Sequence, residues 1–236
     1  MLNKYAHYHD LACLFEYPTD GYTTRVEHAI GLLEKARPEA VDDLRRFREL
    51  LPVESLRAMQ ELFTRSFDVQ AITTLDIGYV LFGDDYKRGE LLSNLNREHR
   101  EAQNECGSEL ADHLPNVLRL LSKLEDQELI EELVQEIIAP AVSEMIGEFT
   151  HERIDKKNKA YRKHYKTLIE APSLPERLAS EQRVARTLFQ FPLRALYTVL
   201  KRDFSIIERI PLAATSDFLE SLNSENEIEE KANAFY

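Results

Sequence analysis

The sequence predicts an all-α protein, a single helical-bundle domain with a C-terminal helical extension. Apolar residues recur at spacings of three and four along almost the whole chain, which is the period of an amphipathic helix. Only 7 glycines and 9 prolines interrupt the 236 residues, and valine, isoleucine and threonine do not gather in the alternating runs that indicate strands. Hydrophobic residues make up 43% of the chain, which is enough to build a substantial core.

Proline, glycine and capping residues bound the helices expected in the first part of the chain. Pro18 ends the first apolar stripe, and Pro38 suits a first helical turn because its missing N–H costs little there. Gly83 is placed to end a helix, and Asp84 or Asp85 can cap the next one. The expected elements are the stripe Tyr8, Leu11, Ala12 and Phe15; a helix over residues 23–35; the stripe Val41, Leu44, Phe47 and Leu51; the stripe Leu56, Met59, Phe63 and Phe67; and the stripe Ile72, Leu75, Tyr79 and Phe82.

The helical pattern continues until the composition changes near residue 150. A helix is expected over residues 86–105, closed by Gly107, and the later stripe over residues 130–138 is kinked or ended at Pro140. Between these lies the stripe Leu114, Val117, Leu118, Leu121 and Leu124; farther on come a basic run over residues 153–166, helices over 175–190 and 193–202, and an acidic tail from residue 217. We therefore divide the chain into a helical domain, residues 1–150, and a helical extension with a frayed tail, residues 151–236.

Charge and cysteine usage limit the partners and the compartment. The formal net charge of −12 argues against nucleic acid, since phosphate binding depends on clustered lysine and arginine. It suits a basic partner, or simply the solubility of a cytoplasmic protein. Cys13 and Cys106 show no zinc-ligand spacing, which is typical of a reducing compartment. The opening residues lack the apolar core of a signal peptide, and no run of about 18 apolar residues would span a membrane. We expect a cytoplasmic protein without stable membrane insertion.

The motifs that mark enzymes and metal sites are missing from the sequence. There is no glycine-rich phosphate loop and no GxSxG nucleophile elbow. A di-iron bundle needs two Glu-x-x-His pairs, and only Glu148 and His151 have that spacing. His7 and His9 would point to different sides of a helix, so we interpret them as surface histidines. The sequence therefore predicts no catalytic residue, no metal and no cofactor.

One polar stretch, ELADHLP at residues 109–115, precedes an apolar helix. Asp112 is a good N-cap for a helix beginning near His113, where its carboxylate would accept a backbone N–H. Pro115 then falls in the first turn, where proline is tolerated. Neither role explains His113, because a neutral histidine at a helix start gains nothing from the helix dipole. It must serve packing, a hydrogen bond or binding.

Together with two upstream blocks, this stretch resembles the TorD/NarJ family of redox-enzyme maturation chaperones, in its nitrate reductase branch. The blocks are ELFTRSFD at residues 61–68 and LDIGYVLFGDDYKRGELL at residues 75–92, and YPT at residues 17–19 also fits that branch. The hallmark of the family is a glutamate followed by Asp-His at the opening of a helix. Glu109, Leu110, Asp112, His113 and Pro115 fill that pattern here. The resemblance covers residues 1–150.

The resemblance implies an all-helical chaperone without catalytic activity. Members of the family bind the apo catalytic subunit of a molybdenum enzyme in the cytoplasm by its N-terminal segment, often a twin-arginine signal or its remnant. They hold this client until molybdenum cofactor and iron–sulfur clusters are inserted. The client here would be a nitrate-reductase-like subunit or a close relative, and the chaperone a monomer or a homodimer.

The resemblance also indicates where the client would bind. A basic amphipathic segment would lie in a groove between helices, with Asp112 and nearby acids meeting its positive charge. An alternative reading is a non-catalytic helical adaptor or scaffold without a molybdoenzyme client. The residues expected to bind the client peptide are Glu109, Asp112, His113, Pro115, Tyr79, Phe82, Tyr86 and Arg88.

Overall fold

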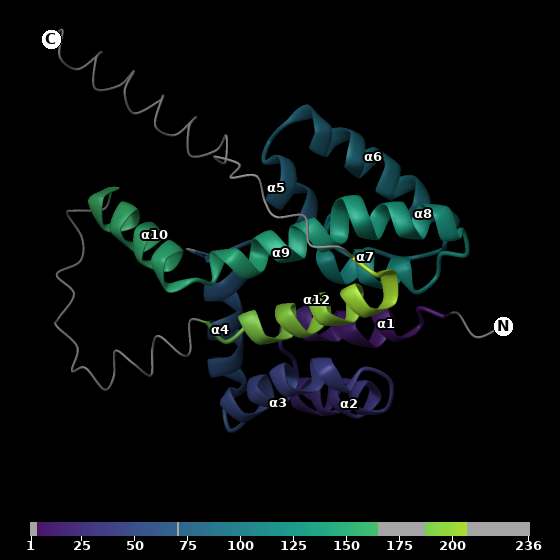
Figure 1. Cartoon of the computed structure of the whole chain (residues 1–236). Helices are drawn as coiled ribbons and strands as arrows, with labels where there is room; N and C mark the ends of the chain where they lie inside the picture. The colour runs from purple at the N-terminus through teal and green to yellow at the C-terminus, as the bar shows by residue number, and fades with distance from the viewer. Residues whose placement is uncertain (1–3, 70, 165–186, 207–236) are drawn as a thin grey trace, which may run out of the picture. The chain divides into compact units, whose positions relative to one another are not determined.

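The computed structural model describes residues 4–69, 71–164 and 187–206, and its regular structure there is helical (Figure 1). The exception among these residues is one isolated antiparallel bridge between Asp76 and His113. The predicted all-α class is therefore confirmed for the described part of the chain. No helix in this part is both long and apolar enough to cross a membrane.

The helices follow one another with short connections. The elements are α1 (His7–Ala12), η1 (Cys13–Phe15), α2 (Tyr22–Ala36), η2 (Pro38–Ala40), α3 (Val41–Leu50), α4 (Leu56–Phe67), α5 (Ile77–Phe82), α6 (Tyr86–Glu101), α7 (Leu114–Leu121), α8 (Gln127–Glu132), η3 (Leu133–Ile138), α9 (Ala139–Glu148), α10 (His151–His164) and α12 (Gln190–Phe204). The expected caps are present where local chemistry decides them. Gly83 ends α5 with φ of 59°, and the Asp85 carboxylate accepts the Lys87 N–H at 2.9 Å to begin α6.

Two expected helix ends are corrected by the structure. Helix α6 ends at Glu101 rather than at residue 105, because the chain turns at Gln103, whose φ is 50°, and the Asn104 side chain is buried against other groups. Pro140 does not end the later stripe. The π-helical turn η3 leads directly into α9, and Pro140 lies in the first turn of α9, where a missing N–H is tolerated.

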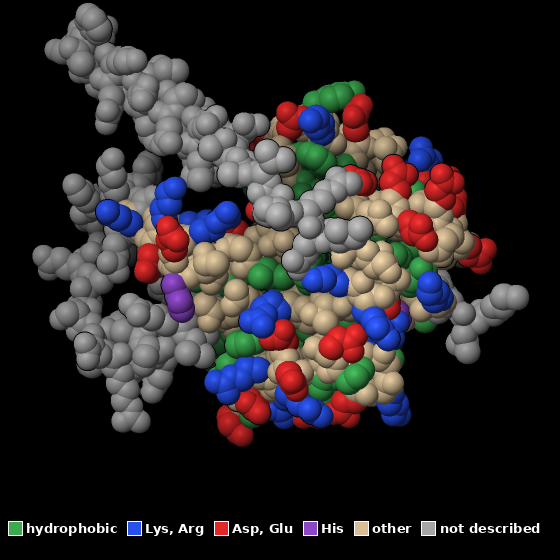
Figure 2. Space-filling view, viewed as in Figure 1, with side chains coloured by type: hydrophobic (Ala, Val, Ile, Leu, Met, Phe, Trp, Pro, Cys, Tyr) green, Lys and Arg blue, Asp and Glu red, His purple; other side chains and the backbone are tan. Residues whose placement is uncertain are grey.

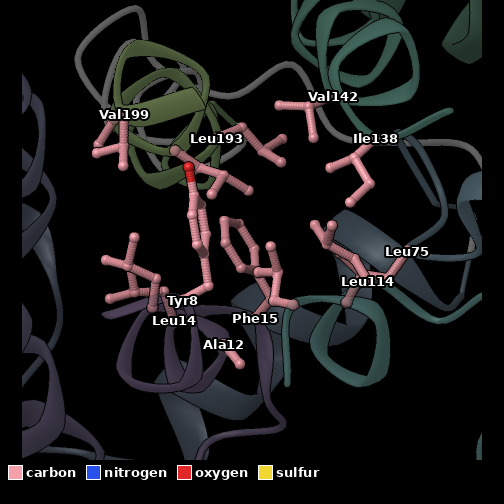
Figure 3. Packing of buried hydrophobic residues seen from close by; sticks show 14 of the residues in the cluster. Tyr8, Ala12, Leu14, Phe15, Leu75, Leu114, Ile138, Val142, Leu193 and Val199 are labelled. Atoms are coloured by element: carbon pink, nitrogen blue, oxygen red, sulfur yellow. The ribbon is translucent and has the colours of Figure 1, made fainter. Parts of the chain in front are cut away.

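The hydrophobic core joins helices from both ends of the described chain. Helix α1 packs against α7 and α2, and α12 packs against α3 and α9. Figure 3 shows Tyr8 and Phe15 beside Leu193 of α12, with Leu114 of α7 near Val142 of α9. Helix α12 thus lies beyond the predicted division at residue 150 yet fills the same core as α1. The helix expected over residues 175–190 and the acidic tail from residue 217 lie almost entirely outside the described residues.

A polar clamp ties the first helix to the last described one. The Asp203 carboxylate lies 2.7 Å from His7 Nε2, 3.1 Å from the Tyr8 hydroxyl and 2.6 Å from Arg37 Nε. Burial alone would raise the pKa of Asp203, but hydrogen bonds from His7 and Arg37 and their charges outweigh it and lower this pKa. The interpretation of His7 as a surface histidine is therefore wrong, because its partner on α12 lies far away in the sequence. His9 is exposed, as expected.

Candidate functional site

Two distant segments meet through a short backbone bridge next to the core. The Ile77 N–H donates to the Asp112 carbonyl at 3.0 Å, and the Leu114 N–H donates to the Leu75 carbonyl at 2.8 Å. Leu75 and Leu114 are buried hydrophobic residues that point into the core (Figure 3). Because these two leucines fix the register, Asp76 lies opposite His113.

The Asp112 carboxylate binds an arginine instead of capping a helix. Asp112 is fully buried, and its Oδ2 accepts a hydrogen bond from Arg88 Nε at 3.0 Å. The N-cap of α7 is His113, and it makes no side-chain capping hydrogen bond. The prediction that Asp112 caps this helix is therefore wrong, since its carboxylate is bound to α6. The prediction that Pro115 lies in the first turn of α7 is confirmed.

Arg88 links Asp112 to a second carboxylate. Its terminal nitrogen donates to Asp76 Oδ2 at 3.2 Å, and its guanidinium lies 5.2 Å from the centre of the Tyr79 ring, within the range of a cation–π contact. Burial would lower the pKa of Arg88, but its hydrogen bonds to Asp112 and Asp76 and their negative charges raise it. The guanidinium is thus held as a cation between the two acids.

The imidazole of His113 completes this group of side chains, which we name the polar cluster: Asp76, Arg88, Asp112 and His113. His113 Nδ1 lies 3.1 Å from Asp76 Oδ1. The hydrogen bond from His113 lowers the pKa of Asp76 and, with the charges of His113 and Arg88, outweighs burial, which raises it. His113 supplies the hydrogen bond that its position at the helix start left open. The His113 side chain is 18% exposed and the Asp76 side chain 27%, so both reach the surface.

A glycine makes room for the buried end of the polar cluster. A Cβ atom on Gly78 would lie 2.7 Å from Asp112 Oδ2, 3.0 Å from Leu91 Cδ2 and 3.3 Å from Arg88 Cγ. Real side chains do not approach so closely. The first turn of α5 can therefore lie against the Asp112 carboxylate only because residue 78 has no side chain.

A second, buried network holds the loop that precedes His113. His99 Nε2 lies 2.9 Å from the Ala111 carbonyl, and its Nδ1 lies 2.9 Å from Asn104 Nδ2, which also donates to the Asn116 carbonyl. The Asn116 amide donates in turn to the Leu110 carbonyl at 2.9 Å. Burial lowers the pKa of His99, although the hydrogen bond to Ala111 opposes this. Both ring nitrogens are satisfied when His99 is neutral with its proton on Nε2.

Exposed side chains surround the polar cluster. Tyr86, in the first turn of α6, is 78% exposed and Leu110 is 49% exposed; Glu109 is also exposed, whereas Tyr79 and Phe82 are half-buried. Of the residues expected to bind a peptide, the structure brings Arg88, Asp112 and His113 into contact and leaves the aromatic residues and Glu109 accessible. Pro115 is buried, so its role is limited to the helix start. That these residues bind a peptide stays a prediction.

The sequence analysis missed several residues of this site. Asp76 was not singled out, although an aspartate directly before the helix IGYVLF stands at its N-cap and such residues are a recognisable signal. Gly78, His99 and Asn104 gave no such signal. Their importance depends on groups that the fold brings next to them from other helices.

The described residues contain no group of three or more histidine, cysteine or acidic side chains placed to hold a metal ion. Glu148, one half of the single Glu-x-x-His pair, is bound by cations. Its Oε2 lies 2.8 Å from Lys157 Nζ, and its Oε1 pairs with Arg153. The arrangement is typical of a salt bridge on a helix surface.

Comparison with known proteins gives no family assignment: neither a scan against protein-family models nor a search of curated proteins found a match. The function is therefore inferred from the residues of this chain and their geometry.

Proposed function

We propose that this protein is a cytoplasmic, system-specific chaperone. It binds the N-terminal segment of the apo catalytic subunit of a nitrate-reductase-like molybdoenzyme and holds that subunit for insertion of molybdenum cofactor and iron–sulfur clusters. One observation supports this most. The two sequence blocks that resemble the TorD/NarJ family, residues 75–92 and 109–115, meet in the polar cluster, where Arg88 and Asp76 face Asp112 and His113.

The surroundings of the polar cluster suit a basic amphipathic segment. Tyr79 lies against Arg88, Tyr86 begins the same helix, and the Leu110 carbonyl accepts the His113 N–H at 3.1 Å. These neighbours offer apolar and aromatic surface next to acids, which is what a helix with an apolar face and basic residues requires. Exposed acids also gather over α8 (Figure 2), and together with the net charge of −12 they favour the approach of a basic segment.

The roles within the proposed site differ from residue to residue. Asp112 is fully buried and bound to Arg88, so it positions Arg88 and does not touch the client. His113, Asp76 and Glu109 are exposed enough for direct contact. The proposed contact surface therefore consists of these three residues with the exposed Tyr86 and Leu110.

The test is capture of the client from the native cells. The tagged full-length chain is expressed under molybdate starvation, and the proteins bound to it are identified by mass spectrometry. A large molybdoenzyme subunit lacking its cofactor, recovered in stoichiometric amount, is the expected result. If no such subunit is recovered even with crosslinking, the proposal fails, and a helical adaptor with another basic partner takes its place.

Matched variants connect capture to the proposed surface. Leu110→Ser and Tyr86→Ser change exposed side chains and should leave stability within about 0.5 kcal/mol while reducing the amount of captured subunit. Val53→Ser is the control, because Val53 is similarly exposed at 41% but lies in the loop between α3 and α4. Equal capture by all three variants would show that the client binds elsewhere.

A further inference from the structure

His113 presents a hydrogen-bond acceptor at the surface, and Asp76 determines which nitrogen this is. An ionised carboxylate can only accept, so His113 Nδ1 must donate its proton to Asp76 Oδ1, 3.1 Å away. The neutral ring therefore has its lone pair on Nε2. No hydrogen bond to Nε2 is made by the residues that the structure describes, and the side chain is 18% exposed. Nε2 is thus an oriented acceptor that a ligand can reach.

The polar cluster is also short of one positive charge. Its charged groups are the carboxylates of Asp76 and Asp112 and the single guanidinium of Arg88, so its net charge is −1 while His113 is neutral. One acceptor remains unused as well, since the buried Asp112 Oδ1 has no hydrogen-bond partner among the described residues. A buried carboxylate that is only partly satisfied favours a nearby cation.

We propose that the polar cluster binds one guanidinium group of its partner, with His113 Nε2 and the exposed edge of Asp76 as the acceptors. Each carboxylate oxygen has two lone pairs, so Asp76 can keep Arg88 and His113 and still accept another donor. A planar guanidinium has several N–H groups in a fixed fork and can address the imidazole and the carboxylate together, which a point-like ammonium does less well. This inference rests on the proposed function, because it names the group of the client segment, an arginine side chain, that this site recognises.

A proton competes with the guanidinium for the same site. Protonation of His113 turns Nε2 from an acceptor into a donor and cancels the net negative charge of the polar cluster. The charged groups around the ring are Asp76 before α5, Arg88 on α6 and Asp112 next to it in the chain. Because two cations cannot occupy the same acceptor, the affinity for a guanidinium falls as the pH is lowered through the range in which histidine titrates.

The test uses the purified full-length chain and methylguanidinium as the probe. Binding is followed through the histidine ring nitrogens by NMR at about pH 8 and about pH 5.5, on either side of the usual histidine titration. Methylurea, which has a similar shape but no charge, is the control ligand. We expect methylguanidinium to shift the Nε2 resonance of His113, methylurea to leave it unchanged, and binding to weaken at the lower pH. Equal binding of the two ligands would overturn the proposal.

A variant isolates the contribution of Nε2. His113→Asn keeps a side-chain N–H near the place of Nδ1 for Asp76 and removes the acceptor at Nε2; it should weaken methylguanidinium binding about tenfold or more. His28→Asn is the matched control, because His28 is an exposed histidine beside a carboxylate, with its Nε2 3.9 Å from Asp10, and should not change binding. Unchanged affinity in His113→Asn refutes the inference. Since neither experiment involves the client, failure here leaves the result of the capture experiment standing.

Discussion

Replacing Gly78 by alanine tests the close packing of the polar cluster. Alanine in place of glycine within a helix normally stabilises a protein by about 0.5–1 kcal/mol. Here the added Cβ would lie 2.7 Å from Asp112 Oδ2 and 3.0 Å from Leu91 Cδ2. Leu91 can move the end of its side chain, but the short Asp112 side chain is fully buried and held by Arg88. Overpacking of this kind costs about 1–3 kcal/mol, so Gly78→Ala should lower the free energy of unfolding despite the helical gain.

Gly31→Ala is the matched control for this prediction. Gly31 lies within α2, and a Cβ there would meet nothing within 4 Å, so this variant should be stabilised. The two variants should differ by about 1–3 kcal/mol in urea unfolding, or by about 2–10 °C in Tm for a chain of this size. If Gly78→Ala is stabilised as much as Gly31→Ala, the Asp112 carboxylate is not fixed against α5, and the description of the polar cluster is wrong.

Three further predictions concern stability. Asp112→Ala should lower the free energy of unfolding in urea by about 3 kcal/mol, because Arg88 loses a buried partner, whereas His113→Ala should cost less than about 1 kcal/mol, since its pair with Asp76 is partly exposed; equal losses would contradict this difference. The pKa of Asp203 is lowered in the fold, so the stability from its carboxylate is present above the unfolded pKa of about 3.9 and is lost as the pH falls through the folded value. Asp203→Asn should flatten the acid side of a plot of Tm against pH, and an unchanged slope would refute that role. The pKa of His99 is also lowered, so its contribution is present above about pH 6.5 and is lost as the pH falls through the folded pKa; His99→Gln should remove this part of the pH dependence of urea unfolding, and a profile like that of the wild type would count against it.

Much of the fold could be predicted from the sequence, because its causes are local. The helical period of the apolar residues, Pro38 in a first turn, Gly83 at a C-cap and Asp85 at an N-cap act through neighbours within a few residues. The helix end at Glu101 could not be predicted in this way. It depends on the buried side chain of Asn104, whose partners His99 and Asn116 lie on two different helices.

The candidate site shows the same division between local and distant causes. Arg88, Asp112 and His113 could be named from short motifs, and the sequence by itself determined that the chain is helical and that a helix starts after His113. The tertiary structure decided what Asp112 does: Arg88 lies 24 residues earlier in the chain, and only the packing of α5, α6 and α7 brings the two together. Likewise, His7 is paired because α12 returns Asp203 to it across 196 residues. A local pattern reports the period and the caps of a helix, but the partner of a buried charge is chosen by whichever distant segment shares its core.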